Sequence, residues 1–439
     1  MCEIMVKLLE LKTYLNMSKK YIFWILIIVL ALVYFTKNDA MPVYAPDRDY
    51  INIEDQLVEQ FILAQDSSVI ELPAGHFLLS QSLSIDGKTN LTIRGQGMDE
   101  TVLSFLGQTS GAEGIKITNS RNIVLEDFAI EDAAGDNLKV SDTDSLVIRR
   151  IRSAWTGEVS VENGAYGIYP VLSTNVIIED CEAIGSSDAG IYVGQSKNVI
   201  IRNNKAFYNV AGIESENSTH VEIYGNEAFK NTSGLLIFNL PGLTMYGQHI
   251  RAYDNKIHDN NLRNFAVKGS IVSATPHGTG VIILATKDVH LFRNTIRNHK
   301  TLNLAIVSYD MFSQENEDQY EIDEQELLER GIQPILPDAS VDPNYDPYPG
   351  RIVLRDNHFD NRFVLPSYEN EYGLLWTIKN KLRIPDIAYD GIIAEGASFQ
   401  DENHKICMIN NGEINFVNLD AANEFEAFSN DIKPFDCQF

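Results

Sequence analysis

Apolar and polar residues alternate in short segments that recur along the chain. The first and third residues of every such segment are apolar, which is a two-residue period. A two-residue period places successive side chains on opposite faces of a strand, so each segment is predicted to be a β-strand with one buried face. The segments read IVLEDF, LVIRRI, VIIEDC, VIIRNN, VEIYGN, IRAYDN, VHLFRN and IVLRDN, and they begin at Ile123, Leu146, Val176, Val199, Val221, Ile250, Val289 and Ile352.

The spacing between these segments is regular. Successive starts are 23, 30, 23, 22, 29, 39 and 63 residues apart. The shortest intervals define one coil, and the longer ones are a coil plus an insertion, except the last, which has room for a further coil. A glycine followed by an apolar residue precedes most segments, as in Gly190-Ile191 and Gly212-Ile213, and glycine permits a tight corner. The repeat predicts an all-β, right-handed parallel β-helix of about ten or more coils.

The sixth residue of the segments forms the strongest column. It changes from large apolar residues to asparagine along the chain: Phe128, Ile151, Cys181, Asn204, Asn226, Asn255, Asn294 and Asn357. Stacked asparagines can each donate to one coil and accept from another, so we expect an internal ladder. Cys181 lies within this column and is therefore predicted to be a buried packing thiol instead of a nucleophile.

The N-terminal part of the chain is expected to contain an export segment and a cap. An apolar run at 21–35 follows Lys19 and Lys20, which is typical of a secretory signal or an uncleaved membrane anchor. Either places the remainder outside the cytoplasmic membrane, in a periplasmic, membrane-anchored or secreted location. An amphipathic helix is predicted over 54–64, where it would cover the open end of the stack.

These features divide the chain into five predicted parts. A signal or anchor occupies 1–40, an N-terminal cap 41–75, the β-helix 76–309, an acidic and proline-rich insertion 310–350, and the last coils with a C-terminal cap 351–439. The insertion is expected to contain a short helix at 320–330.

Charge and cysteine content exclude some functions. The chain has 61 acidic and 35 basic residues, with a formal net charge of −26, and this balance opposes binding to nucleic acid. No CxxC motif is present among the four cysteines, so neither a zinc site nor a thioredoxin-like motif is predicted. Cys407 and Cys437 are the pair that could form a disulfide in an oxidising compartment.

The stretches SKNVIIRNN, GIESENSTHVEIYGN and ATKDVHLFRN resemble the pectate-lyase-like right-handed β-helix superfamily. More narrowly, about residues 50–420 are similar to bacterial envelope proteins known as parallel β-helix repeat proteins. That resemblance implies an exported protein, and a partner such as a periplasmic c-type cytochrome, because members are often encoded beside one. The chain lacks the lipoprotein cysteine of that family and contains no CxxCH.

Outward-facing positions carry two further columns. The fourth residues of the first segments alternate in charge, which predicts ion pairs between coils: Glu126, Arg149, Glu179 and Arg202. The second residues form an aliphatic stripe that we expect something to cover: Val124, Val147, Ile177 and Ile200. Insertions at 155–166, 238–248, 261–279 and 310–350 interrupt the coils. Asp342, Asn344 and Asp346 alternate as in a calcium loop, but Pro347 replaces the required glycine, so a solvated loop is favoured and no cofactor is expected.

A cluster of titratable residues lies between 249 and 299. Five of the nine histidines fall there, beside the 261–279 insertion. Arg251, Tyr253 and Arg263 are predicted to bind an anionic ligand, with the insertion folded over the strand that carries Arg251 and Tyr253. If the protein is an enzyme, His277 and Lys268 are the catalytic candidates.

Two functions fit these residues. One is a binding or accessory module of the cell envelope, for a polysaccharide or an envelope protein. The alternative is a polysaccharide lyase or uronate C5-epimerase, in which a cation neutralises the uronate carboxylate and a base removes the C5 proton. The chain contains neither a DPHE motif nor the paired aspartates of β-helix glycosidases, so the binding module is favoured.

Overall fold

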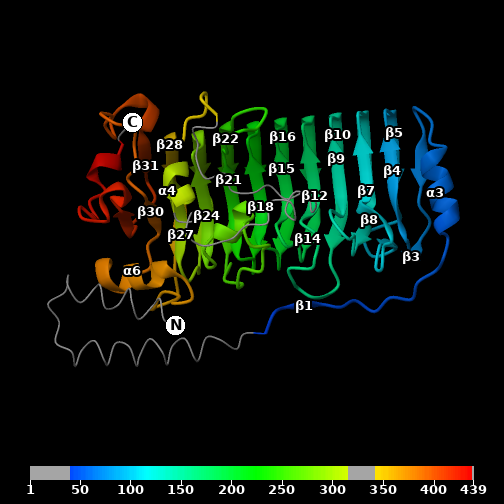
Figure 1. Ribbon diagram of the computed structural model, residues 1–439, viewed down its shortest axis with the longest axis horizontal. Helices are drawn as coiled ribbons and strands as arrows, with labels where there is room; N and C mark the ends of the chain where they lie inside the picture. Colours follow the sequence, from blue (N-terminus) through cyan, green and yellow to red (C-terminus); the bar gives the residue numbers. More distant parts are fainter. Residues whose placement is uncertain (1–39, 315–341, 438–439) are drawn as a thin grey trace.

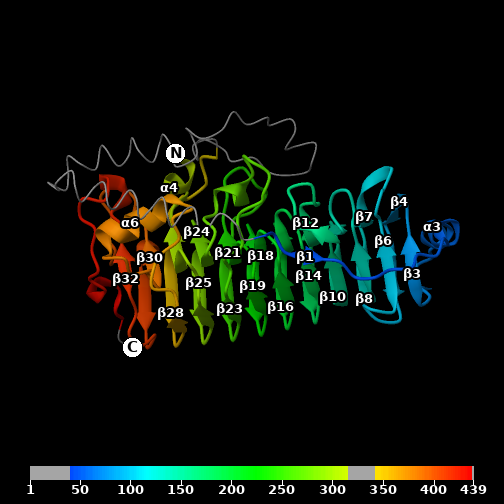
Figure 2. The ribbon, with the colours of Figure 1, turned by 90° about the horizontal axis from the view of Figure 1, so that it is seen from below.

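The computed structural model describes residues 40–314 and 342–437. The described residues stack into an elongated right-handed parallel β-helix, with the N-terminal coils at one end and the C-terminal coils at the other (Figures 1 and 2). This confirms the predicted fold. Each coil has three sides, which we call sheet 1, sheet 2 and sheet 3.

Sheet 2 contains the strands predicted from the repeat. Its register aligns the predicted columns, for example Val147 with Ile177 and Ile177 with Ile200. In order along the stack its strands are β2 (Val69–Glu71), β5 (Thr89–Arg94), β8 (Arg121–Glu131), β10 (Asp144–Ala154), β13 (Thr174–Glu179), β16 (Lys197–Arg202), β19 (Thr219–Tyr224), β22 (Gln248–Tyr253), β25 (Lys287–Phe292), β28 (Gly350–Arg355) and β31 (Ile406–Ile409).

Sheet 3 follows sheet 2 after a short corner. The corner residue adopts a left-handed conformation, for example at Asp180, Asn203 and Gly225, and these residue types tolerate it. Strands β8 and β10 are long enough to run through the corner into sheet 3. Its other strands are β3 (Gly75–Leu78), β6 (Thr101–Ser104), β14 (Glu182–Ile184), β17 (Lys205–Phe207), β20 (Glu227–Phe229), β23 (Lys256–His258), β26 (Thr295–Arg297) and β29 (His358–Asp360).

Sheet 1 closes the coil and has 11 strands among the described residues. They are β4 (Gln81–Asp86), β7 (Ser110–Thr118), β9 (Leu138–Ser141), β12 (Tyr166–Val171), β15 (Ala189–Gly194), β18 (Ala211–Glu216), β21 (Ser233–Phe238), β24 (Thr279–Leu284), β27 (Leu302–Val307), β30 (Ile387–Tyr389) and β32 (Phe416–Asn418). Several of these strands, such as β21 and β24, are buried on both faces. Insertions pack on the outer face of this sheet, so it has two apolar layers.

The predicted helix over 54–64 is present as α3 (Glu54–Ile62), and its Leu57 and Phe61 are buried against the first coil. The first coil begins at β2, inside the predicted cap. The chain before the helix runs beside the stack, where β1 (Val43–Tyr44) pairs antiparallel with β11 (Gly157–Glu158). The remaining helices are α4 (Tyr309–Gln314) and α6 (Glu371–Lys379), with 3₁₀ turns η1 (Ile271–Ala274), η3 (Glu402–His404), η4 (Ala421–Asn423) and η5 (Lys433–Phe435).

The asparagine ladder is confirmed. Asn204 Nδ2 donates to Asn226 Oδ1 at 3.0 Å, and Asn226 Nδ2 donates to Asn255 Oδ1 at 3.0 Å. The column continues through Asn294 and Asn357 to Asn411. A second ladder, not predicted from the sequence, stacks Asn209, Asn231 and Asn260 and ends on His299. Each residue satisfies backbone groups at a buried corner, so both ladders fix the register of the coils.

Both cysteine predictions are confirmed. Cys407 and Cys437 form a disulfide whose Cα atoms are 5.2 Å apart, and it joins the C-terminal tail to β31. Cys181 is free and buried, and burial raises the pKa of its thiol to about 12. A thiol in this environment is inert, as its place in the column predicted.

Some predicted elements lie outside the described residues. The apolar run at 21–35, the helix at 320–330 and the start of the proline-rich stretch are among them. In residues 40–314 and 342–437 no helix is long and apolar enough to cross a membrane.

Candidate functional site

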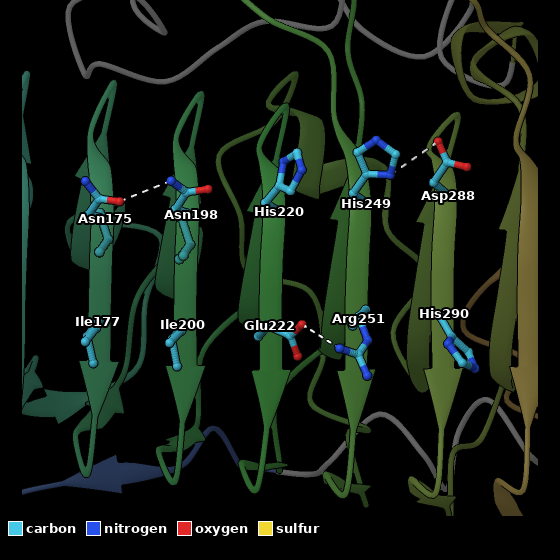
Figure 3. A pocket seen from close by; sticks show the side chains of 12 residues that line it. Asn175, Ile177, Asn198, Ile200, His220, Glu222, His249, Arg251, Asp288 and His290 are labelled. Carbon is cyan, nitrogen blue, oxygen red and sulfur yellow. Dashed lines mark hydrogen bonds and ion pairs between the residues drawn. The ribbon is translucent and has the colours of Figure 1, made fainter.

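An open groove crosses the outer face of sheet 2, from β13 to β25, with a volume of about 640 Å³ (Figure 3). Its lining side chains come from two outward rows of five successive strands. The first row is Asn175, Asn198, His220, His249 and Asp288, and the second is Ile177, Ile200, Glu222, Arg251 and His290. The rows follow directly from the two-residue period, because alternate residues between the buried ones point outward.

The first row is polar throughout. Its five members have positive φ values between 55° and 58°, so they sit at the turn that enters each strand. Asn198 Nδ2 donates to Asn175 Oδ1 at 3.1 Å, while His249 Nδ1 lies 3.7 Å from Asp288 Oδ2. Side-chain contacts between neighbouring coils therefore fix the donors and acceptors along one wall of the groove.

The second row changes from apolar to charged halfway along the groove. Ile177 and Ile200 form an apolar floor at one end, and Arg251 donates to Glu222 Oε1 at 3.0 Å at the other. His290 follows Arg251. Burial and the neighbouring Arg355 and Arg251 lower the pKa of His290, so it is neutral near pH 7. Its Nε2 has no hydrogen-bond partner among the described residues and can accept or donate one.

An aromatic stack lies beside the second row. The rings of Tyr224 and Tyr253 are 4.9 Å apart, and those of Tyr253 and Phe292 are 4.7 Å apart, with interplanar angles of 8° and 13°. The faces of the rings are occupied by one another and by guanidinium groups, such as that of Arg293, which lies 4.8 Å from the Phe292 centroid. The stack therefore supports the strands that hold Arg251 and His290.

The two remaining columns of sheet 2 are also present. Glu126 pairs with Arg94 and Arg149, each at 2.6 Å, and Glu179 pairs with Arg202, so the predicted charge ladder is confirmed. The aliphatic stripe stacks in register and is half-buried. Its last two members, Ile177 and Ile200, are the apolar floor of the groove.

The structure divides the predicted binding residues between two sides of the molecule. Arg251 and Tyr253 point outward from β22, as the period requires. The 261–279 insertion does not fold over them: its Val267 and Val272 pack with Leu236 of β21, on the outer face of sheet 1. The predicted position of the insertion was therefore wrong. The physical reason is that the outer face of sheet 1 is apolar at this level and binds the apolar residues of the insertion.

The other predicted site residues, Arg263, Lys268 and His277, belong to the insertion and lie with it on sheet 1. Arg263 and Lys268 are exposed and do not line the groove. His277 is buried, with Nε2 2.7 Å from Ser367 Oγ. Burial, Lys300 and Arg263 lower the pKa of His277 to about 4, so the imidazole is neutral near pH 7 and is a weak base. In this arrangement His277 connects the insertion to the segment that leads into α6.

A second group of titratable residues lies on the outer face of sheet 1, over β12, β15 and β18. Three carboxyl groups, Asp188, Glu214 and Glu216, are 4%, 1% and 4% exposed. We call them and the adjacent tyrosines, Tyr166, Tyr169 and Tyr192, the carboxyl–tyrosine cluster. The three tyrosine rings contact one another, with centroids 4.5 to 4.9 Å apart.

The ionisation of this cluster is strongly perturbed. Burial raises the pKa of Glu216 to about 7, although the Tyr192 hydroxyl donates to its Oε1 at 2.7 Å. Burial, together with the neighbouring carboxyl groups, raises the pKa values of Asp188 and Glu214 well above their ordinary range. Sequence reasoning missed this cluster. The available signal was β18, AGIESE, which places Glu214 and Glu216 where β21 has Leu236 and Phe238.

Metal binding has little support in the described part of the chain. No group of three histidine, cysteine or acidic side chains there is positioned to hold a metal ion. In the calcium-like stretch, Asp342 accepts hydrogen bonds from the Gly242 amide at 3.2 Å and from the Tyr246 hydroxyl at 2.9 Å. Its oxygens thus hold the 238–248 insertion in place.

A comparison with known protein families agrees with the fold. The family model described as right handed beta helix region matches residues 156–316. A pre-neck appendage protein of Bacillus phage B103 is 28% identical over 163 residues, which are 30% of this chain and 19% of that protein, so the chain spans about a fifth of this relative's length. Among solved structures, the mannuronan C-5 epimerase AlgE4 A-module of Azotobacter vinelandii is 16% identical with a TM-score of 0.48, covering 83% of this chain and 95% of that one. The Agl-KA catalytic domain is 14% identical with a TM-score of 0.48, covering 80% and 64%.

Proposed function

We propose that this right-handed parallel β-helix protein is an exported cell-envelope module that binds an acidic polysaccharide in the sheet 2 groove. The observation that carries the proposal is the lining of the groove. Apolar Ile177 and Ile200 lie in line with Arg251 and His290, on one continuous face of five strands. A sugar ring offers C–H groups to an apolar floor and hydroxyl groups to polar side chains, so this mixture suits a glycan.

The length and rigidity of the face favour a chain over a single sugar. Neighbouring strands of a sheet are about 4.8 Å apart, so five strands span about 19 Å between the first and the last. Both outward rows repeat at this spacing, and contacts between coils hold the side chains in fixed positions. An extended glycan can therefore contact several coils without reorganising the protein, which reduces the entropic penalty of binding.

An acidic glycan is favoured by the charge of the groove relative to the rest of the protein. The chain has a formal net charge of −26, which would repel a polyanion over most of its surface. In the groove, Arg251 is exposed and three histidines lie within the same two rows, and the two carboxylates there, Glu222 and Asp288, are paired with Arg251 and Arg351. The Arg251 guanidinium makes one hydrogen bond to Glu222, which it can exchange for a hydrogen bond to a carboxylate of the ligand.

The test is glycan binding by the full-length chain in detergent, measured by calorimetry on acidic polysaccharides such as alginate and polygalacturonate. Arg251→Ala is expected to weaken binding about tenfold or more, because it removes a charge-assisted contact. Lys205→Ala is the matched control, since Lys205 is an exposed cation on β17, outside the groove. If both variants bind with the affinity of the wild type, the binding surface lies elsewhere. If the chain instead binds an envelope protein and Ile200→Asp abolishes that binding, a protein partner is favoured.

A further inference from the structure

We propose that the carboxyl–tyrosine cluster on sheet 1 is a general acid–base site, in which Glu214 and Glu216 hydrolyse a glycosidic bond of an uncharged glycan. This activity is separate from binding in the sheet 2 groove. The cluster lies on another side of the coil and its residues do not line the groove.

The first support is the placement of the two glutamates. Glu214 and Glu216 are two residues apart on β18, so their side chains leave the same outer face, about 6.6 Å apart along the strand. The adjacent strand β15 places Tyr192 beside Glu214 in register and brings Asp188 to the same group. This is the backbone spacing of the two residues, and side chains that leave a strand at this spacing can hold two carboxyl groups far enough apart to admit a water molecule.

The second support is the kind of charge that surrounds Glu214. The cation at the edge of the cluster, Lys139, lies 4.8 Å from the centroid of the Tyr169 ring and pairs with Asp136. On sheet 2, partly or fully buried carboxylates such as Glu126 and Asp288 pair with arginines. The charged groups that act on Glu214 are Asp188 and Glu216, which are themselves acidic. Burying three carboxyl groups together is strongly unfavourable for folding unless they stay protonated. A buried group of carboxyls of this kind is therefore a candidate for a chemical role.

The third support is an unsatisfied atom. Glu214 is 1% exposed, yet its Oε2 has no hydrogen-bond partner among the described residues. Buried polar atoms are almost always paired, so an orphan at the centre of a polar cluster indicates a place for a ligand atom. By contrast, Glu216 accepts the Tyr192 hydroxyl at 2.7 Å, a bond that favours its ionised form.

These environments separate the roles of the two groups. Burial and the neighbouring carboxyl groups raise the pKa of Glu214 well above its ordinary range, which favours the protonated form and the role of acid. Glu216, with a pKa of about 7, can act as the base. Glu216 takes a proton from a water molecule while the water oxygen bonds to the anomeric carbon. The glycosidic C–O bond breaks, and Glu214 donates its proton to the leaving oxygen. Proton exchange with solvent restores both groups, and the anomeric configuration is inverted.

The chemistry of the cluster also selects its substrate. A uronate would add another carboxylate to a group that already contains three, so the site favours an uncharged glycan. Two insertions flank the cluster: Ala165 and Tyr166 end the first, and Leu240 belongs to the second. Thr244 of the second insertion is bonded to Gln195 Oε1 at 2.8 Å. Because the cluster is buried, these insertions must open for a substrate to enter.

The experiment measures reducing ends released by the full-length chain from uncharged glycans (α- and β-glucans, mannan and arabinan) between pH 5 and 8. Glu214→Gln and Glu216→Gln are each expected to lower the rate about 100- to 10,000-fold. Glu179→Gln, a carboxylate of sheet 2 that does not line the groove, is the matched control and should leave the rate unchanged. Proton NMR of the first product should show inversion.

The insertions could keep the site closed under the assay conditions. Gln195→Ala removes the hydrogen bonds that hold Thr244 of the 238–248 insertion, so it is assayed beside the wild type. The proposal is overturned if neither the wild type nor Gln195→Ala hydrolyses any of these glycans, or if Glu214→Gln keeps the wild-type rate. If Glu216 has only a structural role, Glu216→Gln should lower the rate without changing the shape of the pH–rate profile. If Glu216 is the base, Glu216→Gln should remove the acidic limb of that profile. Hydrolysis of uncharged glycans and binding of acidic glycans are measured in separate experiments, so this proposal and groove binding can fail independently.

Discussion

The acidic residues on the outer faces of sheets 1 and 2 differ in their burial and in the charge of their neighbours. On sheet 2, carboxylates such as Glu126 and Asp288 are paired with arginines from neighbouring coils, and the groove between them is open. On sheet 1, Glu214 and Glu216 are covered, and the neighbouring charges that act on Glu214 are negative. The difference shows that the repeat satisfies charge wherever it continues undisturbed. On the sheet that the insertions cover, Glu214 and Glu216 are instead buried beside other carboxyl groups.

The largest expected difference between the faces is in the pH dependence of folding stability. The pKa of Glu216 rises from 4.5 to about 7 on folding, so its contribution is fully present below about pH 4.5 and is lost as the pH rises through 7. That shift corresponds to about 3 kcal/mol. Urea unfolding of the wild type should therefore show lower stability at pH 8 than at pH 5, and Glu216→Gln should reduce this difference. A wild-type midpoint that does not change between these pH values would contradict the burial of the cluster.

The paired face should respond with the opposite sign. The hydrogen bond from Arg351 lowers the pKa of Asp288, so its contribution is present at neutral pH and is lost as the pH falls through the folded value, below about 4. Asp288→Asn is expected to destabilise the protein by at most about 1 kcal/mol at pH 7, because the pair is partly exposed. The same denaturant series at pH 3.5 should show a smaller effect. An effect that grows on acidification would contradict the prediction.

The smallest effect should come from the charge ladder. Glu126 contacts three arginines, so Arg149→Ala leaves two partners in place and should lower stability by about 0.5 kcal/mol or less at low salt. Thermal unfolding with and without 0.5 M NaCl would measure it. Arg121→Ala, which removes a single 3.6 Å contact with Asp144, provides the comparison. A large loss of stability for Arg149→Ala would show that the charge ladder, and not the asparagine ladder, sets the register of sheet 2.

The sequence predicts sheet 2 better than sheet 1 for a physical reason. A strand with one buried face alternates, and columns such as that of Asn204 and Asn226 repeat in register. Strands of sheet 1 such as β21, SGLLIF, are buried on both faces and show no alternation. The glycines expected at corners, such as Gly212 and Gly234, lie inside these strands, where a Cβ would clash with the next coil, and they do not reveal which residues face outward.

The same limit applies to the sites. Period alone placed Arg251 and Tyr253 correctly on the outer face of β22. It could not place His277, because an insertion packs on whichever face offers apolar surface, and that depends on residues from distant coils. Glu214 and Glu216 were missed because their significance appears only after β18 is compared with β21 in the aligned sheet.

The antiparallel pairing of β1 with β11 has a mechanical consequence. Residues 40–50 run beside the stack, held by two residue pairs at Val43 and Tyr44 and by the buried contact of Arg48 with Glu131 at 2.7 Å. A pulling force applied upstream of residue 40 therefore reaches the solenoid at the level of β11 before it reaches the first coil. Three weak points would have to yield in succession before tension acts on α3. Residues 40–50 would thus transfer a pulling force to the middle of the solenoid and keep it from acting first on α3 and the first coil.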